Sequence, residues 1–228
     1  MSRFIWFDLG YTLLYEPREL AYQRVLAECG HSVTLDTLEQ AFHVADKLVM
    51  RQYPDVFGHD PETFMPLFLG LLNHRLGVRL DLCRTWQRLK EERRALDVRW
   101  LPFPNVKTVL ADLKRRNVRM GVITNWDPTA RAILHGHGLE CFFEQVVISS
   151  EVGLEKPDPA IFELAMTRAA VGPAESLYVG DNYYVDAMGA RRVGMRCLIV
   201  NRFGTLGVEE IQEPILIHDV SEVIGRLS

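Results

Sequence analysis

Five short apolar runs in the second half of the chain, separated by helical patterns, constrain the fold most strongly. The apolar runs cover residues 118–124, 145–149, 176–180, 195–200 and 214–217. They are rich in β-branched residues, which is typical of strands that are covered on both faces. The helical patterns cover residues 106–116, 128–138, 159–170 and 183–193. Strands and helices that alternate at this spacing predict βαβ units and a parallel sheet.

The first part of the chain has a different texture. Residues 4–8 form one more buried run of strand composition, but residues 16–100 show only helical periodicity and no convincing strand. Prolines interrupt the helical patterning at both boundaries of this block. We therefore predict an α/β fold class, with a Rossmann-like parallel sheet that carries helices on both faces. Residues 1–15 and 101–228 form the core, and residues 16–100 form a helical cap inserted after the first strand.

Composition and charge exclude several classes of protein. The chain has 228 residues, of which 48% are hydrophobic and 25% are charged, as in a soluble globular protein. The net charge of −4 is mild, so neither nucleic acid nor a membrane is an expected partner. The four cysteines are far apart, which disfavours a disulfide framework or a zinc site. Without a signal peptide or a membrane-spanning run, we expect a cytoplasmic protein.

Polar residues follow several of the predicted strands at the point where each strand ends. Asp8 follows the first strand, Thr124 and Asn125 end the second, and Asp181 follows the run 176–180. Ligands of open α/β sheets bind at the carboxyl ends of the strands, near the point where the strand order reverses. Each residue alone has an ordinary structural explanation, such as a helix N-cap for an aspartate. Their joint occurrence predicts one site at this sheet edge.

Four separated motifs carry a resemblance to a known family. They are F-D-L-G-Y-T-L around Asp8, V-I-T-N around Thr124, E-K-P-D-P around Lys156, and V-G-D-N-Y-Y-V-D around Asp181. In this order, and with a helical block after the first, the chain resembles the haloacid dehalogenase-like hydrolase superfamily, in its phosphatase-like branch with a cap of the first type. The first motif matches only in part and the last matches completely. The resemblance also implies that the Lys156-Pro157 peptide bond is cis.

The resemblance implies a role for each matching residue. Asp8 would be the nucleophile that forms an aspartyl-phosphate intermediate, which divides one difficult displacement into two easier ones. Thr124 and the Asn125 backbone would bind the phosphoryl oxygens of the substrate. Lys156 would neutralise the charge of the phosphate and of the nucleophile, and catalysis would thus rest on Asp8, Thr124 and Lys156.

The resemblance also implies a Mg²⁺ site. Mg²⁺ prefers hard oxygen ligands, and it would bridge a carboxylate and a phosphate that otherwise repel each other. Asp8 and Asp181 would provide carboxylate oxygens, and Gly10 would provide its backbone carbonyl. Asp186 would be a further carboxylate beside the metal or near it.

Gly10 is the main departure from the family pattern. Phosphatases of the family usually carry a second aspartate there, which protonates the leaving group and later activates water. General acid–base catalysis of this kind contributes about 10²–10⁴ in rate. Three alternatives stand: another residue, for example Glu16 or a cap histidine, supplies the proton; the substrate has a good leaving group; or the activity is slight.

Three hypotheses about function therefore stand. The first is a Mg²⁺-dependent phosphatase for a small phosphorylated metabolite. The second is a metal-independent 2-haloacid dehalogenase, a class that also lacks the second acid but is not expected to keep an aspartate at the position of Asp181. The third is a catalytically weakened member of the fold that serves in binding or regulation. The sequence does not distinguish a monomer from a homodimer.

Overall fold

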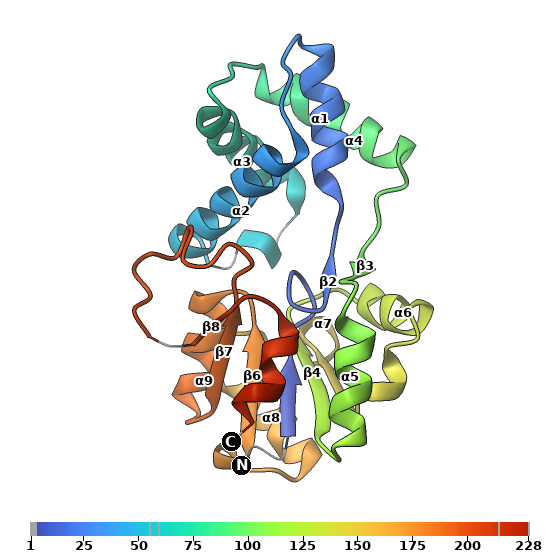
Figure 1. The fold of residues 1–228 in the computed structure, drawn as a ribbon, viewed down its shortest axis with the longest axis vertical. Helices are drawn as coiled ribbons and strands as arrows, with labels where there is room; N and C mark the ends of the chain where they lie inside the picture. The colour runs from blue at the N-terminus through green and yellow to red at the C-terminus, as the bar shows by residue number, and fades with distance from the viewer. Residues whose placement is uncertain (1–3, 55, 59, 214, 228) are drawn as a thin grey trace. The chain divides into compact units, whose positions relative to one another are not determined.

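The structure is a computed structural model that describes residues 4–227 except 55, 59 and 214. It contains a six-stranded sheet. Its strands are β1 (Phe4–Phe7), β4 (Arg119–Thr124), β5 (Gln145–Ile148), β6 (Ser176–Gly180), β7 (Arg196–Val200) and β8 (Leu216–Ile217). They lie in the order β5-β4-β1-β6-β7-β8, and every neighbouring pair is parallel (Figure 1). The predicted α/β fold class with a parallel sheet is confirmed. Pro214, at the start of the last predicted run, lies outside the described residues.

The strand order reverses at β1. The chain passes from β4 outward to β5 on one side of β1, and then from β6 outward through β7 to β8 on the other side. Phe7 at the end of β1 pairs in register with Val122 of β4 and with Val179 of β6. The carboxyl ends of these three strands therefore meet at one place, which is where a doubly wound sheet binds its ligand.

Helices cover both faces of the sheet. They are α5 (Val106–Arg115), α6 (Thr129–Gly136), α7 (Ser149–Val152), α8 (Pro159–Ala169), α9 (Met188–Arg192), and the 3₁₀ segments η2 (Glu140–Phe142), η3 (Pro173–Glu175) and η5 (Val220–Arg226). On one face, α8 and α9 bury a cluster around Trp6, Phe162 and Tyr178. Helices α5 and η5 contact each other and lie side by side in Figure 1.

The region 183–193 differs from the single helix that its pattern predicts. Residues Tyr183–Ala187 form a π-helical turn (η4), and only Met188–Arg192 continue as an α-helix. The Asn182 side chain begins this turn by accepting hydrogen bonds from the backbone N–H groups of Tyr184 and Val185. A single π-helical turn inside a helical stretch is frequent at functional sites, and here it carries Asp186.

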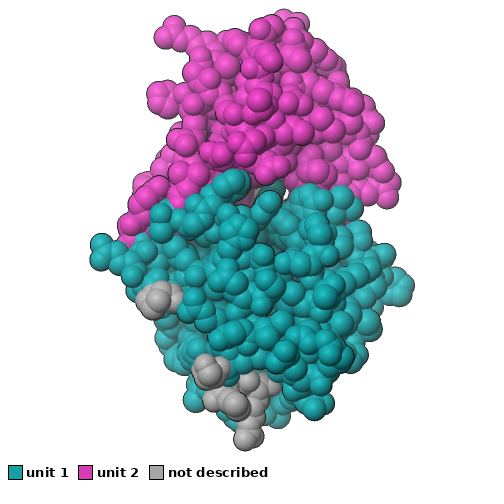
Figure 2. All heavy atoms as spheres, viewed as in Figure 1, with its two compact units in different colours: residues 1–15, 101–205, 211–228 teal, residues 16–100, 206–210 magenta. Residues whose placement is uncertain are grey.

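The chain divides into two units, which are coloured separately in Figure 2. The sheet unit contains residues 1–15, 101–205 and 211–228, and the helical unit contains residues 16–100 and 206–210. The sequence analysis placed the short segment 206–210 with the core. Within the helical unit, this segment is bound by α2, since Arg51 donates to the Gly207 carbonyl at 3.3 Å and the His43 ring lies 2.9 Å from the Leu206 carbonyl.

In the helical unit, the described residues form four α-helices around a core of their own. They are α1 (Arg18–Glu28), α2 (Leu35–Gln52), α3 (Pro61–Leu76) and α4 (Leu82–Ala95), with the 3₁₀ turn η1 (Val56–Gly58) between α2 and α3. Thr34, Asp60 and Asp81 cap the N-termini of α2, α3 and α4 with their side chains. None of the helices formed by the described residues has both the length and the apolar character needed to cross a membrane.

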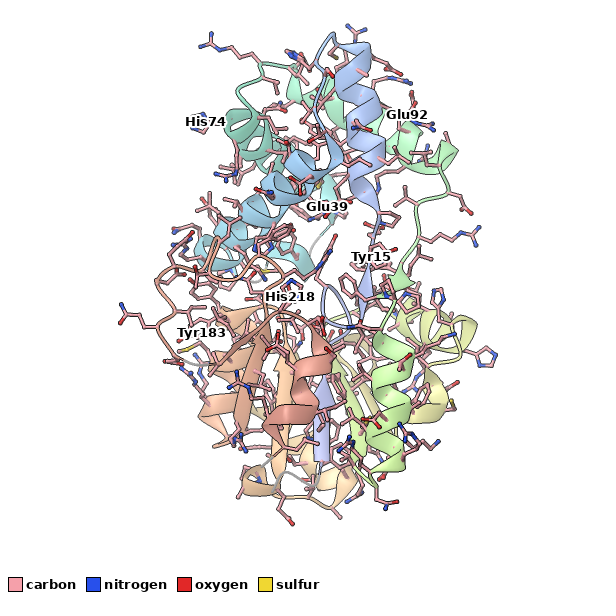
Figure 3. The ribbon with its side chains drawn as sticks, viewed as in Figure 1. Tyr15, Glu39, His74, Glu92, Tyr183 and His218 are labelled. Atoms are coloured by element: carbon pink, nitrogen blue, oxygen red, sulfur yellow. The ribbon has the colours of Figure 1, made fainter. Side chains whose placement is uncertain are left out.

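A short antiparallel pair, β2 (Leu14–Tyr15) and β3 (Leu101–Pro102), was not predicted. Two-residue strands leave no period in the sequence, and Pro102 disfavours a strand, so no pattern could have indicated them. The Tyr15 ring, labelled in Figure 3, stacks on Phe103 with ring centroids 4.9 Å apart. Both residues belong to the sheet unit.

Candidate active site

Three adjacent strands deliver polar side chains to one edge of the sheet. Asp8 directly follows β1, Thr124 ends β4, and Asp181 directly follows β6. The Asp8 backbone N–H donates to the Val179 carbonyl at 2.9 Å, so the sheet ladder extends to the aspartate itself. All three polar side chains are almost fully buried. The structure thus brings together residues that the strand-end pattern selected.

Lys156 is the centre of the hydrogen-bond network at this edge. Its Nζ lies 2.8 Å from Oδ1 of Asp8, 2.7 Å from Oδ1 of Asp186 and 2.8 Å from the hydroxyl of Tyr178. A lysine ammonium has three N–H donors, and here each has an acceptor. Lys156 is only 4% exposed, so these bonds replace the water that burial removes.

The Asn125 side chain holds the backbone of Lys156. Its Oδ1 accepts from the Lys156 N–H at 2.8 Å, and its Nδ2 donates to the Lys156 carbonyl at 2.8 Å. The predicted cis peptide bond between Lys156 and Pro157 is confirmed. The predicted role of Asn125 concerned its backbone, so this use of the side chain is an additional finding.

Asp186 joins two segments of the site. While its Oδ1 accepts from Lys156, its Oδ2 accepts from the backbone N–H groups of Asp181 at 3.1 Å and Asn182 at 2.9 Å. It is 1% exposed. Since both oxygens are engaged, Asp186 acts in this structure as an anchor for Lys156 and for the chain that carries Asp181.

Burial and charge shape the electrostatics of the cluster. Burial raises the pKa of Asp8, and the neighbouring Asp186 raises it further, against the opposing effects of Lys156 and of a hydrogen bond with Thr124. Burial alone would lower the pKa of Lys156, but Asp186 and Asp8 outweigh it and raise that pKa above its usual range. Burial, Asp186 and Asp8 also raise the pKa of Tyr178 well above 10.0, so its hydroxyl stays protonated.

The donor set fits a divalent cation. Carboxylate oxygens of Asp8, Asp181 and Asp186 lie within 4.8 Å of one another, and hard oxygen ligands of this kind suit Mg²⁺. When ionised, three carboxylates and the one ammonium of Lys156 leave a charge of −2 in a buried place. Both oxygens of Asp186 already accept hydrogen bonds from within the site. The predicted Gly10 carbonyl ligand stays a prediction.

One of the residues considered as a substitute for the missing acid has another partner. Glu16 forms an ion pair with Arg93 at 2.6 Å within the helical unit. His74, labelled in Figure 3, is an exposed residue near the end of α3. Tyr183 lies on the sheet unit, where Arg191 donates to its hydroxyl at 3.2 Å. The Tyr183 side chain also packs against the core cluster around Trp6, Phe162 and Tyr178.

Tyr178 is a member of the site that the sequence analysis did not select. It lies inside an apolar strand, where a buried tyrosine is indistinguishable from any large core residue. A strand-end rule finds only residues that follow a strand. Its position directly before the motif V-G-D-N-Y-Y-V-D, three residues before Asp181, is the one signal that was present.

Comparisons with known proteins agree with this geometry. The model of the haloacid dehalogenase-like hydrolases matches residues 73–194. The haloacid dehalogenase-like hydrolase domain-containing protein 3 of Bos taurus is 31% identical over 206 residues, which cover 87% of this chain and 81% of that protein. The glyceraldehyde 3-phosphate phosphatase of Methanothermobacter thermautotrophicus is 41% identical over 106 residues, which cover 44% of this chain and 45% of the relative.

A solved structure extends the likeness to the whole fold. The HAD phosphatase of Thermococcus onnurineus superposes with a TM-score of 0.61 at 25% identity, and the match covers 100% of this chain and 98% of that one. This chain matches several of its relatives over less than half of their own length. The activities in the names of these relatives are therefore properties of those proteins. The family model, the bovine relative and the strand-end cluster agree, and this chain belongs to the haloacid dehalogenase-like hydrolases.

Proposed function

We propose that this protein is a Mg²⁺-dependent phosphatase that acts on a small phosphorylated metabolite, with Asp8 as the nucleophile. The observation that carries the proposal is the buried cluster of three carboxylates, Asp8, Asp181 and Asp186, in which the Lys156 ammonium pairs with Asp8 and Asp186. Such a cluster is suited to a divalent cation and a phosphate dianion together. A haloacid displacement needs neither of these, and it gives no reason to bury the second carboxylate, Asp181.

The proposed reaction proceeds in two displacements at phosphorus. An oxygen of Asp8 forms a bond to phosphorus while the bond to the leaving oxygen breaks, and the leaving oxygen departs with the electron pair. Water then attacks the aspartyl phosphate, which releases inorganic phosphate and restores the Asp8 carboxylate. A Mg²⁺ ion held by Asp8 and Asp181 would lower the charge repulsion between carboxylate and phosphate.

The other residues hold this geometry in place. Lys156 keeps Asp8 oriented through its 2.8 Å hydrogen bond and offsets its charge. Thr124 forms a hydrogen bond with the same carboxylate, and it stands at the strand end next to the reacting oxygen. Preorganised positioning of the reacting groups, together with electrostatic stabilisation, accounts for most of the catalysis in phosphoryl transfer.

The named activities of relatives support the phosphatase class. One relative is a phosphatase of a three-carbon sugar phosphate, and this favours a substrate of similar size. Because Gly10 has no acidic side chain, we propose that phosphate esters with good leaving groups react fastest.

Hydrolysis of p-nitrophenyl phosphate and of a panel of phosphorylated metabolites tests the proposal, with Mg²⁺ and with EDTA. Wild type is compared with Asp8→Asn and with Asp112→Asn, a half-buried aspartate of α5 that pairs with Arg115 and Arg116. We expect turnover that requires Mg²⁺, is lost in Asp8→Asn and persists in Asp112→Asn. Absence of turnover on every phosphate ester would refute the phosphatase. Halide release from 2-haloacids without metal would then establish the dehalogenase.

A further inference from the structure

The Tyr178 hydroxyl joins the Lys156 ammonium to the backbone of β4. It lies 2.8 Å from the Lys156 Nζ and 2.7 Å from the carbonyl oxygen of Ile123. An ammonium only donates and a carbonyl only accepts, so the direction of both bonds is fixed. Lys156 donates to Tyr178, and Tyr178 donates to Ile123.

Lys156 is thus tied to β4 at both of its ends. Asn125 holds its backbone N–H and carbonyl, while the path through Tyr178 to Ile123 holds its ammonium. Ile123 and Asn125 are the two neighbours of Thr124 in the chain. The position of the lysine charge is therefore set relative to the strand end that carries the threonine.

The Tyr178 ring is itself held rigidly. The residue is 0% exposed, and it pairs in register with Trp6 of β1 and with Cys197 of β7. Its ring packs edge to face against Phe162 of α8, with ring centroids 5.4 Å apart. A side chain packed between strand and helix in this way has no room for a second rotamer. The hydroxyl is a fixed reference point, unlike a flexible surface group.

We propose that Tyr178 is a positioning residue for phosphoryl transfer, whose hydroxyl fixes the Lys156 ammonium between Asp8 and Asp186. The inference rests on the proposed function and adds a residue to it. Tyr178 touches neither substrate nor reacting atoms in this account, since it acts through Lys156. The hydroxyl is needed because two carboxylates alone leave the third N–H of the ammonium without an acceptor and allow it to move.

Removal of the hydroxyl should affect the rate more than substrate binding. Tyr178→Phe keeps the ring and the lysine charge, so electrostatic attraction of a phosphate is retained and KM should change less than threefold. The alignment of Asp8 is lost, and kcat should fall about 10–100-fold. This is the typical loss of activity when a residue that orients the groups of a site by a hydrogen bond is replaced. A merely structural role would lower stability and leave kcat of the folded protein unchanged.

Tyr22→Phe is a matched control. Tyr22 is also 0% exposed, and its hydroxyl donates to Asn73 inside the helical unit. Both variants lose one buried hydroxyl, which has two hydrogen bonds at Tyr178 and one at Tyr22, so we expect both to be less stable than wild type in urea unfolding. Only Tyr178→Phe should lose kcat on p-nitrophenyl phosphate with saturating Mg²⁺.

A second measurement follows the ammonium directly, without activity. In protein labelled with ¹⁵N-lysine, a buried and fully bonded ammonium exchanges its protons slowly and gives an NMR signal, which Lys156→Met assigns by its loss. We expect this signal to broaden or vanish in Tyr178→Phe and to persist in Tyr22→Phe. An unchanged signal in Tyr178→Phe would overturn the inference.

The two measurements separate the inference from the proposed function. If wild type hydrolyses phosphate esters and Tyr178→Phe keeps kcat within twofold, the positioning role is wrong while the phosphatase stands. If wild type hydrolyses none of them, the phosphatase is wrong. The ammonium signal then still decides whether Tyr178 fixes Lys156.

Discussion

A Cβ atom added to Gly180 would lie 2.1 Å from Oδ2 of Asp186, a separation that no real structure tolerates. The last residue of β6 is a glycine because the Asp186 carboxylate occupies the space of its side chain. We predict that Gly180→Ala displaces Asp186, loosens Lys156 and lowers kcat at least about tenfold. Steady-state kinetics on folded protein measures the effect.

Gly136→Ala is the control for that prediction. It lies at the end of α6, and a Cβ there would meet no other atom within 4 Å. Its activity should equal that of wild type. Equal activity in both alanine variants would show that Asp186 moves aside at no cost to catalysis.

Gly121 of β4 meets the ring of Trp6 in the same way. Its added Cβ would lie 2.4 Å from the Trp6 ring, and both residues are paired in register inside the sheet. Overpacking of a filled core costs about 1–3 kcal/mol, so Gly121→Ala should lower the free energy of unfolding by about this amount. Urea unfolding at neutral pH measures it, and a variant as stable as wild type would contradict the packing.

The sheet was predictable because its information is local. A strand that is covered on both faces is apolar along most of its length, and such a stretch can be recognised in the sequence as a short apolar run, for example residues 118–124. The strand ends were predictable for the same reason. Parallel order then places Asp8, Thr124 and Asp181 at one edge, which explains how the sequence located most of the site.

The remaining features depend on contacts between distant segments. Tyr178 acquires its role only when Lys156, 22 residues earlier, comes to its hydroxyl. A helical period does not distinguish an α-helix from the π-helical turn at Tyr183–Ala187. Residues 206–210 contact α2 through two backbone carbonyls, which bond to Arg51 and His43, and through an ion pair between Glu210 and Arg51. No periodic sequence pattern indicates contacts of this kind between distant segments.

The helical unit contains a charge whose effect on stability depends on pH. Glu62 at the start of α3 accepts from Lys90 at 2.6 Å and from Trp86 Nε1 at 2.9 Å. The Lys90 bond, with that of Trp86, holds the pKa of Glu62 below its ordinary 4.5. The unfolded chain therefore binds the proton more readily, so this stabilisation is present above pH 4.5 and is lost as the pH falls through the lowered pKa.

Glu62→Gln should accordingly be less stable than wild type at pH 7, and the difference should shrink as the pH falls below 4.5. Urea unfolding between pH 3 and pH 7 measures it. Glu163→Gln, an exposed change on α8 with the same loss of charge, is the control that corrects for the loss of one negative charge from the chain. A difference for Glu62→Gln that grows toward acid pH would reverse the sign of the argument.

Gly10 determines which substrates the proposed phosphatase can use. p-Nitrophenolate leaves without a proton, whereas an alkoxide needs an acid, and Gly10 has no acidic side chain. We predict that Gly10→Asp raises kcat/KM for alkyl phosphates relative to p-nitrophenyl phosphate, by at least tenfold out of the roughly 10²–10⁴ that acid catalysis contributes. The ratio of the two rates is measured on the same preparation, so losses of folded protein cancel.

The comparison of Gly10→Asp with Gly10→Asn separates acid catalysis from the mere presence of a side chain. Asparagine has nearly the same size and cannot give up a proton in this way, so the ratio should rise only with aspartate. An equal ratio in wild type and in both variants would mean that another group already protonates the leaving oxygen. A search for that group would then begin with side chains that change the alkyl phosphate rate alone, because p-nitrophenyl phosphate reports the nucleophile without the acid.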